Sequence, residues 1–103
     1  MSEIKLNSEY DDLDKYEYDG DIHYCKKDTK ISHNPYGPAV IFFDGTKIYC
    51  IQNKTHRLDG PAIIYSSGRE RYYINNYPLT KEEFEKHPDV LKYLGKEYLI
   101  CLK

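Results

Sequence analysis

The sequence predicts a mainly β (α+β) protein: an antiparallel sheet of repeated β-hairpins with a short helical segment near the C-terminus. The first observation is a duplication, because residues 33–50 recur 23 positions later as residues 56–73. The second is the pattern inside each copy, where short apolar runs flank a glycine-containing turn, as is typical of a hairpin. The third is a helix-capping signature from Thr80 to Glu83, which follows the end of the alternating pattern at Pro78.

The duplicated segment indicates one small structural unit that stacks on itself. Both copies contain the tripeptide Gly-Pro-Ala, and the proline is expected at the first residue of a strand because it cannot donate to a ladder. An earlier, degraded copy is visible 25 residues upstream, where Gly20 matches Gly45 and Tyr24 matches Tyr49. Its leading strand, residues 16–18, is polar and is expected at the edge of the sheet.

Each hairpin is expected to have a two-residue turn, at Asp44-Gly45 and at Ser67-Gly68. This register gives the strands two faces, because side chains alternate along a strand. The face expected to form the core carries Val40, Phe42, Tyr49, Ile51, Ile63, Tyr65, Tyr72 and Ile74. The opposite face carries Ile41, Phe43, Ile48, Cys50, Ile64, Ser66, Arg69, Arg71 and Tyr73. Because the first of these hairpins is apolar on both sides, we expect the N-terminal segment or the C-terminal tail to cover its back.

The length of 103 residues predicts a single domain with three parts. Residues 1–14 are acidic and polar and are expected to form a mobile lead-in or an irregular first strand. Residues 15–77 hold the hairpins, and residues 78–103 hold a helical cap and tail. Within the cap, Thr80 begins one short helix anchored by Leu79 and Phe84. A second helix is expected from Asp89 to Gly95, and Glu97–Leu102 is expected as a final strand or a folded apolar tail.

Composition limits the classes of function. The net charge is −2 with 31% charged residues, which disfavours a nucleic-acid binder that works by neutralising phosphates, and equally a polybasic membrane anchor. No apolar run approaches the ~20 residues of a membrane span, and no signal peptide is visible. Three cysteines without an export signal predict reduced thiols and a cytoplasmic location. Most of the twelve tyrosines are expected to pack on strands, with a minority exposed for recognition.

No catalytic or metal-binding arrangement stands out. His33 and His56 recur near Cys25 and Cys50, but zinc sites usually take their ligands in close pairs, and no such pair is present. Cys50 with His56 would be the only nucleophile and base, and Cys50 is expected in the middle of a packed strand. We therefore predict a non-enzymatic protein with neither a metal nor a cofactor.

The best candidate for a binding surface is the strand face that carries Arg69, Arg71 and Tyr73, flanked by His56 and Arg57. Arginine and tyrosine are enriched at protein interfaces, and two arginines on one side of a strand suit an acidic protein surface or a phosphate-bearing ligand. The alternative interpretation is an ordinary solvated strand face with Glu70 and Glu97 as counter-charges.

The repeated segment resembles the short repeats found in many copies in giant-virus, phage and some bacterial proteins, which are related in style to MORN (membrane occupation and recognition nexus) repeats. The matching residues are Asp44-Gly45-Thr46-Lys47, Tyr49-Cys50 and His56-Arg57-Leu58-Asp59-Gly60-Pro61-Ala62, with Pro78-Leu79-Thr80-Lys81-Glu82-Glu83-Phe84 as a terminal element. The resemblance covers about residues 33–86. It implies hairpins laid side by side in an elongated, twisted sheet, and binding rather than catalysis. The chain departs from the repeat at Asn34-Pro35-Tyr36, where Arg-x-Asp is typical.

These observations predict a protein-binding module, and the resemblance extends this to a phage or viral protein that binds and inhibits a host defence protein in the host cytoplasm. Two alternatives remain open: a protein that sequesters a small molecule such as a nucleotide between Arg and Tyr side chains, and a binder of single-stranded nucleic acid through stacked tyrosines. The negative charge disfavours the second. Homo-oligomerisation is also expected, because an open sheet has edges that invite pairing.

Overall fold

The computed structural model describes residues 3–96 and has the predicted mainly β class, with an eight-stranded antiparallel sheet, a separate two-stranded ladder and two short helices in that range. The strands are β1 (Glu3–Leu6), β2 (Leu13–Tyr18), β3 (Asp21–Lys26), β4 (Val40–Ile41), β5 (Lys47–Ile48), β6 (Cys50–Ile51), β7 (Lys54–Thr55), β8 (Ile63–Ile64), β9 (Glu70–Ile74) and β10 (Tyr77–Leu79). The helices are α1 (Lys81–Lys86) and α2 (Pro88–Tyr93). The molecule is elongated, measuring 51 × 30 × 19 Å along its principal axes.

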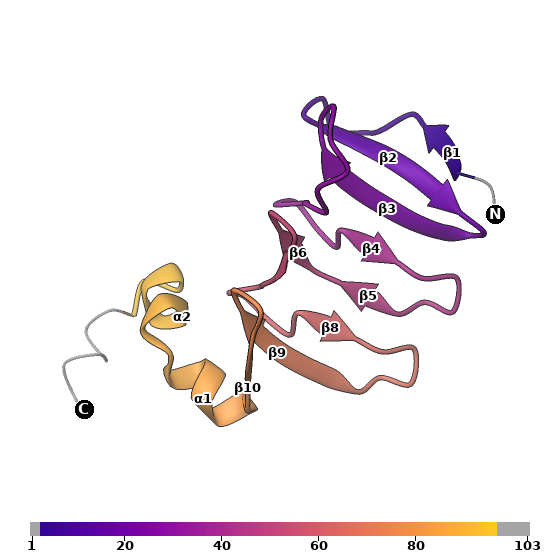
Figure 1. Ribbon diagram of the computed structural model, residues 1–103. Helices are drawn as coiled ribbons and strands as arrows, with labels where there is room; N and C mark the ends of the chain where they lie inside the picture. The colour runs from indigo at the N-terminus through magenta and orange to yellow at the C-terminus, as the bar shows by residue number, and fades with distance from the viewer. Residues whose placement is uncertain (1–2, 97–103) are drawn as a thin grey trace.

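Three hairpins lie side by side in this sheet, as the duplication predicts (Figure 1). They are β2–β3, β4–β5 and β8–β9, and the full order is β1-β2-β3-β4-β5-β8-β9-β10 with neighbours antiparallel. Of the two alternatives predicted for the N-terminal end, a first strand is present, and residues 3–6 pair with β2 in regular register. The prediction that residues 16–18 lie at the edge of the sheet is therefore wrong.

The predicted register of the two repeated hairpins is wrong by one residue. Val40 pairs with Ile48 and Ile41 with Lys47. The turn has three residues, because the Phe42 N–H donates to the Thr46 carbonyl at 2.8 Å. Gly45 ends the turn in the left-handed region with φ of 96°, and Gly68 repeats this geometry with φ of 94°. An Asp-Gly pair suits both a two-residue turn and this three-residue turn, so the local signal alone did not separate them.

The corrected register changes which side chains share a face. Ile48 and Cys50 lie on the same side as Val40 and pack with it, and Arg71 lies directly opposite Ile63. The arginine face of the sheet, as we call it, therefore carries both the apolar side chains and the arginines that the sequence had assigned to opposite sides. Its residues on the repeated hairpins are Val40, Phe42, Ile48, Ile63, Tyr65, Arg69 and Arg71.

The opposite side, which we call the tyrosine face, carries one tyrosine at the same position of each unit. Each of the three rings is covered by a different group. Tyr10 packs edge-on against Tyr24, the Arg57 guanidinium lies 3.9 Å from the Tyr49 ring centroid, and Phe84 lies 4.7 Å from the Tyr72 ring centroid. The repeated position is thus structural, as predicted for most of the tyrosines. Tyr36, Tyr65, Tyr77 and Tyr93 are among the exposed large side chains.

A repeated hydrogen-bond pattern joins each unit to the next. His33 Nδ1 accepts from the backbone N–H of Gln52, and His56 Nδ1 accepts from that of Asn75, both at 3.0 Å. Equivalent residues are 25 positions apart between the first and second units and 23 apart between the second and third, and one loop accounts for the difference. Four residues separate the paired Lys26 and Ile31, whereas the equivalent turn between β6 and β7 has two. The histidines therefore serve as turn acceptors in this architecture.

The C-terminal cap confirms the helix predictions. Thr80 Oγ1 accepts from the Glu83 N–H at 3.1 Å and Glu83 Oε1 accepts from the Thr80 N–H at 2.9 Å, which completes the capping box. Helix α2 begins at Pro88, and Gly95 follows it with φ of 74°. Phe84 and the α2 residue Val90 form a buried cluster with Ile74, with Leu58, Tyr72 and Leu79 packed around it.

The cap does not cover the first repeated hairpin. It packs on β9 and β10 instead, and Phe43 at the tip of the β4–β5 hairpin is 84% exposed. The prediction that the N-terminal segment or the cap buries the back of this hairpin is therefore wrong for residues 3–96. The final strand or tail predicted at Glu97–Leu102 lies outside the described residues.

We predict that Gly45→Ala lowers the free energy of unfolding by about 1–2 kcal/mol, the cost of placing an L-residue in the left-handed region. A Cβ at Gly45 would meet nothing within 4 Å, so the cost is one of backbone conformation alone. Gly68→Ala should behave alike. Gly37→Ala is the matched control, because Gly37 lacks such a φ and its nearest atom lies 4.0 Å away. Urea unfolding measures all three, and equal losses for Gly45 and Gly37 would contradict the turn geometry.

Candidate functional site

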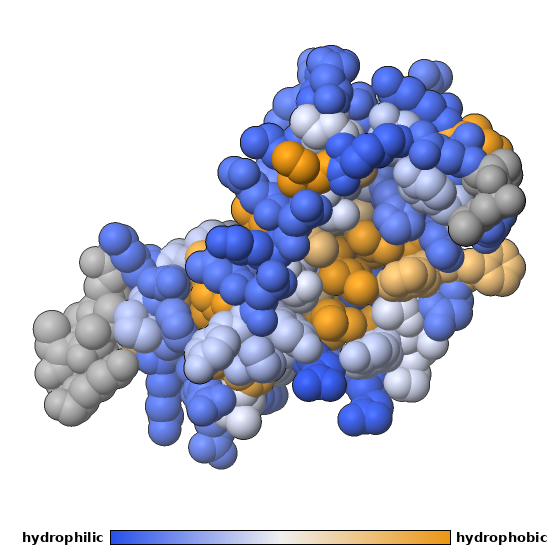
Figure 2. Space-filling view, viewed as in Figure 1, coloured by the Kyte–Doolittle hydropathy of each residue, from blue (hydrophilic) through white to orange (hydrophobic). Residues whose placement is uncertain are grey.

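The arginine face presents an apolar row that crosses three strands. Val40 on β4 is 7% exposed, while Phe42, Ile48 and Ile63 are half-buried and Tyr65 is 36% exposed. In Figure 2 this hydrophobic surface lies over β4, β5 and β8, between the hydrophilic N-terminal hairpin and the hydrophilic side chains of β9. Val40 is buried within the row, whereas Phe42, Ile48, Ile63 and Tyr65 keep part of their surface accessible because no second layer covers this side of the sheet in residues 3–96.

The row ends on β9 at two exposed arginines. Arg71 lies 6.0 Å from the ring centroid of Tyr73, and neither Arg69 nor Arg71 forms an ion pair with a carboxylate of residues 3–96. Both line a shallow hollow of about 280 Å³ together with Asp44 and Thr46. The backbone N–H of Thr46 donates to Asp44 and lowers the pKa of this carboxyl, so the hollow holds one fixed anion among its cations.

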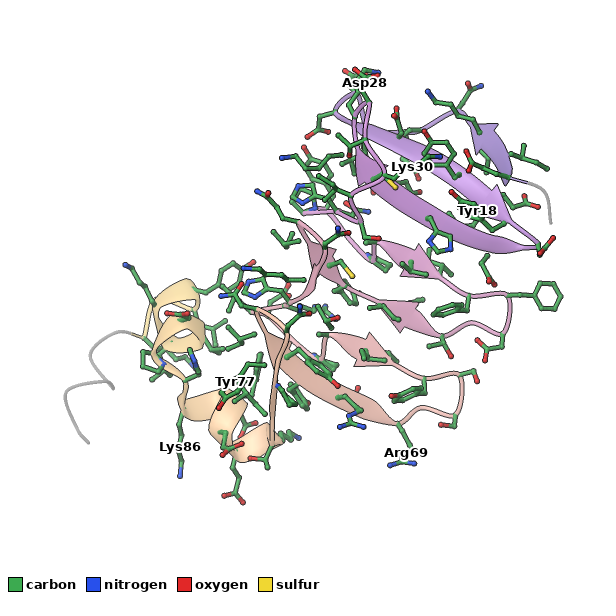
Figure 3. All side chains as sticks on the ribbon, in the orientation of Figure 1. Tyr18, Asp28, Lys30, Arg69, Tyr77 and Lys86 are labelled. Carbon is green, nitrogen blue, oxygen red and sulfur yellow. The ribbon has the colours of Figure 1, made fainter. Side chains whose placement is uncertain are left out.

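The other end of the face differs, because its charges are already neutralised. Lys30 Nζ lies 2.6 Å from Glu3 Oε2 and 3.6 Å from the ring centroid of Tyr16, and the Tyr18 hydroxyl donates to Glu3 at 2.9 Å. The hydrogen bond to Glu3 raises the pKa of Lys30. Figure 3 shows Tyr18 on the N-terminal hairpin, Lys30 in the loop beside it and Arg69 at the far end of the sheet. The free positive charge of the face is therefore concentrated at β9.

The structure separates the five predicted site residues into two groups. Arg69, Arg71 and Tyr73 share the arginine face, whereas His56 and Arg57 line a different groove of about 310 Å³ near Tyr49. The Arg57 guanidinium makes three contacts there. Its Nε donates to Asp59 at 2.8 Å, its Nη1 donates to the Pro61 carbonyl at 3.1 Å, and its Cζ lies 3.9 Å from the Tyr49 ring centroid.

Asn34 shows that Arg57 has a structural role. At the equivalent position of the preceding unit, Asn34 Nδ2 donates to the Pro38 carbonyl at 3.0 Å, as Arg57 does to Pro61. Asn34 Oδ1 also accepts from the Tyr36 N–H at 2.8 Å, and the residue is 3% exposed. The loop therefore keeps its hydrogen bond where the sequence departs from Arg-x-Asp. The buried amide of Asn34 binds the proline carbonyl of its Gly-Pro-Ala segment, as the Arg57 guanidinium does in the next unit.

The sequence did not identify Phe43 as a surface residue. Its backbone N–H donates to Asp21 Oδ1 at 2.7 Å, and its ring lies against Gly20, where a Cβ would come within 2.8 Å. Ser66 at the same position of the next unit makes the equivalent backbone bond to Thr46 Oγ1 at 3.1 Å. The signal was present in the sequence, since an aromatic ring in one copy and a serine in the other indicate a position that the fold does not need to bury.

The two described cysteines are poorly suited to chemistry. Cys25 and Cys50 are buried, and burial raises the pKa of both thiols, which keeps them protonated and weakly nucleophilic at neutral pH. Across residues 3–96 no cluster of three or more His, Cys, Asp or Glu side chains is arranged to hold a metal ion.

Comparison with protein-family models, with curated proteins and with solved structures finds no match. Neither α1 nor α2, the helices of the described range, is long or apolar enough to cross a membrane.

We predict that the free energy of unfolding falls as the pH is lowered from 7.5 to 5.5. Burial lowers the pKa of His33 and His56 below 6.5, and protonation would also remove the Nδ1 acceptor that each offers to a backbone N–H. The unfolded chain therefore binds more protons in this range, so stability is lost as the pH drops through about 6.5. Urea unfolding at a series of pH values measures the slope.

The control is the double variant His33→Asn/His56→Asn, since the Asn oxygen can accept the same backbone bond and does not titrate. Its slope should be shallower than that of the parent chain. An unchanged slope would show that the two turn histidines do not cause the pH dependence.

Proposed function

We propose that this chain is a non-enzymatic module that binds a protein partner through the arginine face. The observation that carries the proposal is an accessible apolar row that ends at two exposed arginines without a carboxylate counter-ion in the described range. Apolar side chains contribute about 25 cal/mol per Å² that they bury on binding. Arginine adds orientation, because its planar group binds a carboxylate through two parallel hydrogen bonds.

The partner chemistry follows from this arrangement. A complementary segment places apolar side chains over Ile48 and Ile63 and carboxylates over Arg69 and Arg71. At the N-terminal end such a segment meets no uncompensated charge, since Lys30 is paired with Glu3, whereas at β9 its carboxylates must lie away from Asp44, which lines the same hollow as the arginines. The resemblance to viral and phage repeats makes a protein of the infected host the partner class that we propose, including a defence protein that the chain would inhibit by occupying it.

Phe43 extends the surface at the tip of the β4–β5 hairpin. Phe43 is 84% exposed and follows the half-buried Phe42 in the sequence. Aromatic side chains are enriched in the cores of protein interfaces, so an aromatic residue exposed to this extent is a candidate contact for a partner. We propose that Phe43 anchors the partner by entering an apolar pocket on it.

The groove beside Arg57 is the weaker candidate. Its lining includes the exposed rings of Tyr36 and Tyr93, and its volume of about 310 Å³ is at the lower limit of ligand sites. Its arginine is committed to Asp59, Pro61 and Tyr49, so little free charge remains to bind an anionic ligand such as a nucleotide. The arginine face therefore supports protein binding better than the groove supports nucleotide binding.

We predict that the double variant Arg69→Glu/Arg71→Glu loses binding to acidic, apolar peptides. The test selects binders to the immobilised chain from a random peptide library and measures their affinity by calorimetry. Selected sequences should combine carboxylates with apolar residues, and the double variant should bind them at least tenfold more weakly. Lys47→Glu/Lys54→Glu is the control, because it makes the same charge change at exposed lysines away from this face. Peptides that lack carboxylates, or that bind both double variants equally, would contradict the proposal.

We predict that Phe43→Ser weakens partner binding by tenfold or more without loss of stability. Burial of a phenylalanine side chain contributes about 1.5–3 kcal/mol to binding. The unfolding free energy should stay within about 0.5 kcal/mol of the parent, as for surface substitutions in general, and Ser66 shows that the fold accepts serine there. Tyr77→Ser, at a residue that is 72% exposed, is the matched control. Equal affinity of the Phe43 and Tyr77 variants would remove Phe43 from the interface.

A further inference from the structure

The outer edge of β1 is open in the described part of the chain. β1 pairs with β2 on one side, and no other strand of residues 3–96 pairs with its second side. Its residues Glu3, Ile4 and Lys5 are exposed, and Ile4 retains 48% of its accessible surface. An edge of this kind presents backbone N–H and C=O groups to any strand that can align with it.

The opposite edge of the sheet is protected. It is formed by β10, where Pro78 has no N–H to donate, and the chain turns directly from Leu79 into the capped helix α1. Within residues 3–96 the eight-stranded sheet therefore offers one edge for pairing. Pairing of two such edges gives a dimer that cannot extend further through this sheet, because neither copy has a second edge of the same kind in residues 3–96.

The sequence of β1 is complementary to itself in one antiparallel register. With the two-fold axis at Ile4, each Ile4 faces the other, and each Glu3 faces Lys5 of the second copy. Opposite charges across a strand pair stabilise it, and an axis at Glu3 or at Lys5 would instead place like charges face to face. Charge and apolar contact therefore select the same register.

Both charged residues of β1 already form ion pairs within one chain, and these pairs fit the two-fold register. Within one chain Glu3 is bound by Lys30 at 2.6 Å, and Lys5 lies 3.7 Å from the buried Asp14. In the two-fold register these pairs join into a row of alternating sign, from Lys30 and Glu3 of one copy to Lys5 and Asp14 of the other. The row occurs twice, once on each side of the axis.

We propose that two copies of this chain associate through antiparallel pairing of β1, with Ile4 on the two-fold axis. The product is one continuous sheet that displays two arginine faces. This inference rests on the edge strand alone and is independent of the function proposed above.

The first experiment locates the axis with a disulfide. Ile4→Cys in a Cys101→Ser background should give a covalent dimer under mild oxidation, because directly opposed strand residues have Cα atoms about 4.5–5.5 Å apart. Lys5→Cys in the same background is the control, since the two copies of residue 5 are diagonal neighbours about 7–8 Å apart. Non-reducing electrophoresis reads the result. No dimer with Ile4→Cys, or equal dimer with Lys5→Cys, overturns the proposed register.

The second experiment tests the charges by mixing two variants. Glu3→Lys alone places lysines at both positions of the edge, and Lys5→Glu alone places glutamates at both, so each should sediment as a monomer. An equimolar mixture should sediment as a dimer, because every cross-strand pair then has opposite charges. Circular dichroism of each variant confirms that it is folded. A parent chain that remains monomeric at millimolar concentration, or a mixture that shows no gain in mass, overturns the proposal.

Discussion

The whole sheet depends on the close contact between successive hairpins at two alanines. Ala39 and Ala62 have no exposed surface, and each bonds to both neighbouring strands through its backbone. The Ala39 carbonyl accepts from Tyr24 and its N–H donates to Ile48, and the next unit repeats this pattern 23 residues later. Because both alanine side chains are fully buried in close-packed surroundings, a larger side chain at either position would require its neighbours to move.

Residues 3–96 hold two separate buried clusters rather than one central core. One buried cluster lies around Ala39, Val40 and Cys50, and the other lies between β9 and the helices around Ile74, Phe84 and Val90. Each unit is stabilised by its neighbours, so stability accumulates along the array as in other repeat proteins. The cap has a second role, because it buries the tyrosine face of the final unit and leaves the arginine face open.

The distribution of charge gives the two ends of the sheet different properties. At the N-terminal end, Lys30 is neutralised by Glu3, and Lys5 lies beside Asp14. At β9, Arg69 and Arg71 form no ion pair with a carboxylate of residues 3–96, although Asp44 lines the same hollow. The neutral end suits contact with a copy of the same charge pattern, and the basic end suits an acidic partner. A dimer joined at β1 would place its two basic ends far apart and carry two equivalent binding surfaces.

The sequence by itself determined the features that depend on short-range interactions. The sequence positions of the two glycine turns and the Thr80–Glu83 capping box depend on neighbouring residues, and both were correctly predicted. It did not determine the hairpin register, because Asp44-Gly45 is compatible with two turn lengths, and a shift of one residue exchanges the faces of a strand. The tertiary structure alone decided that Arg69 and Arg71 share a face with Ile63 and that Arg57 is bound within a loop. It also decided that Phe43 is exposed, since exposure depends on what the rest of the chain covers.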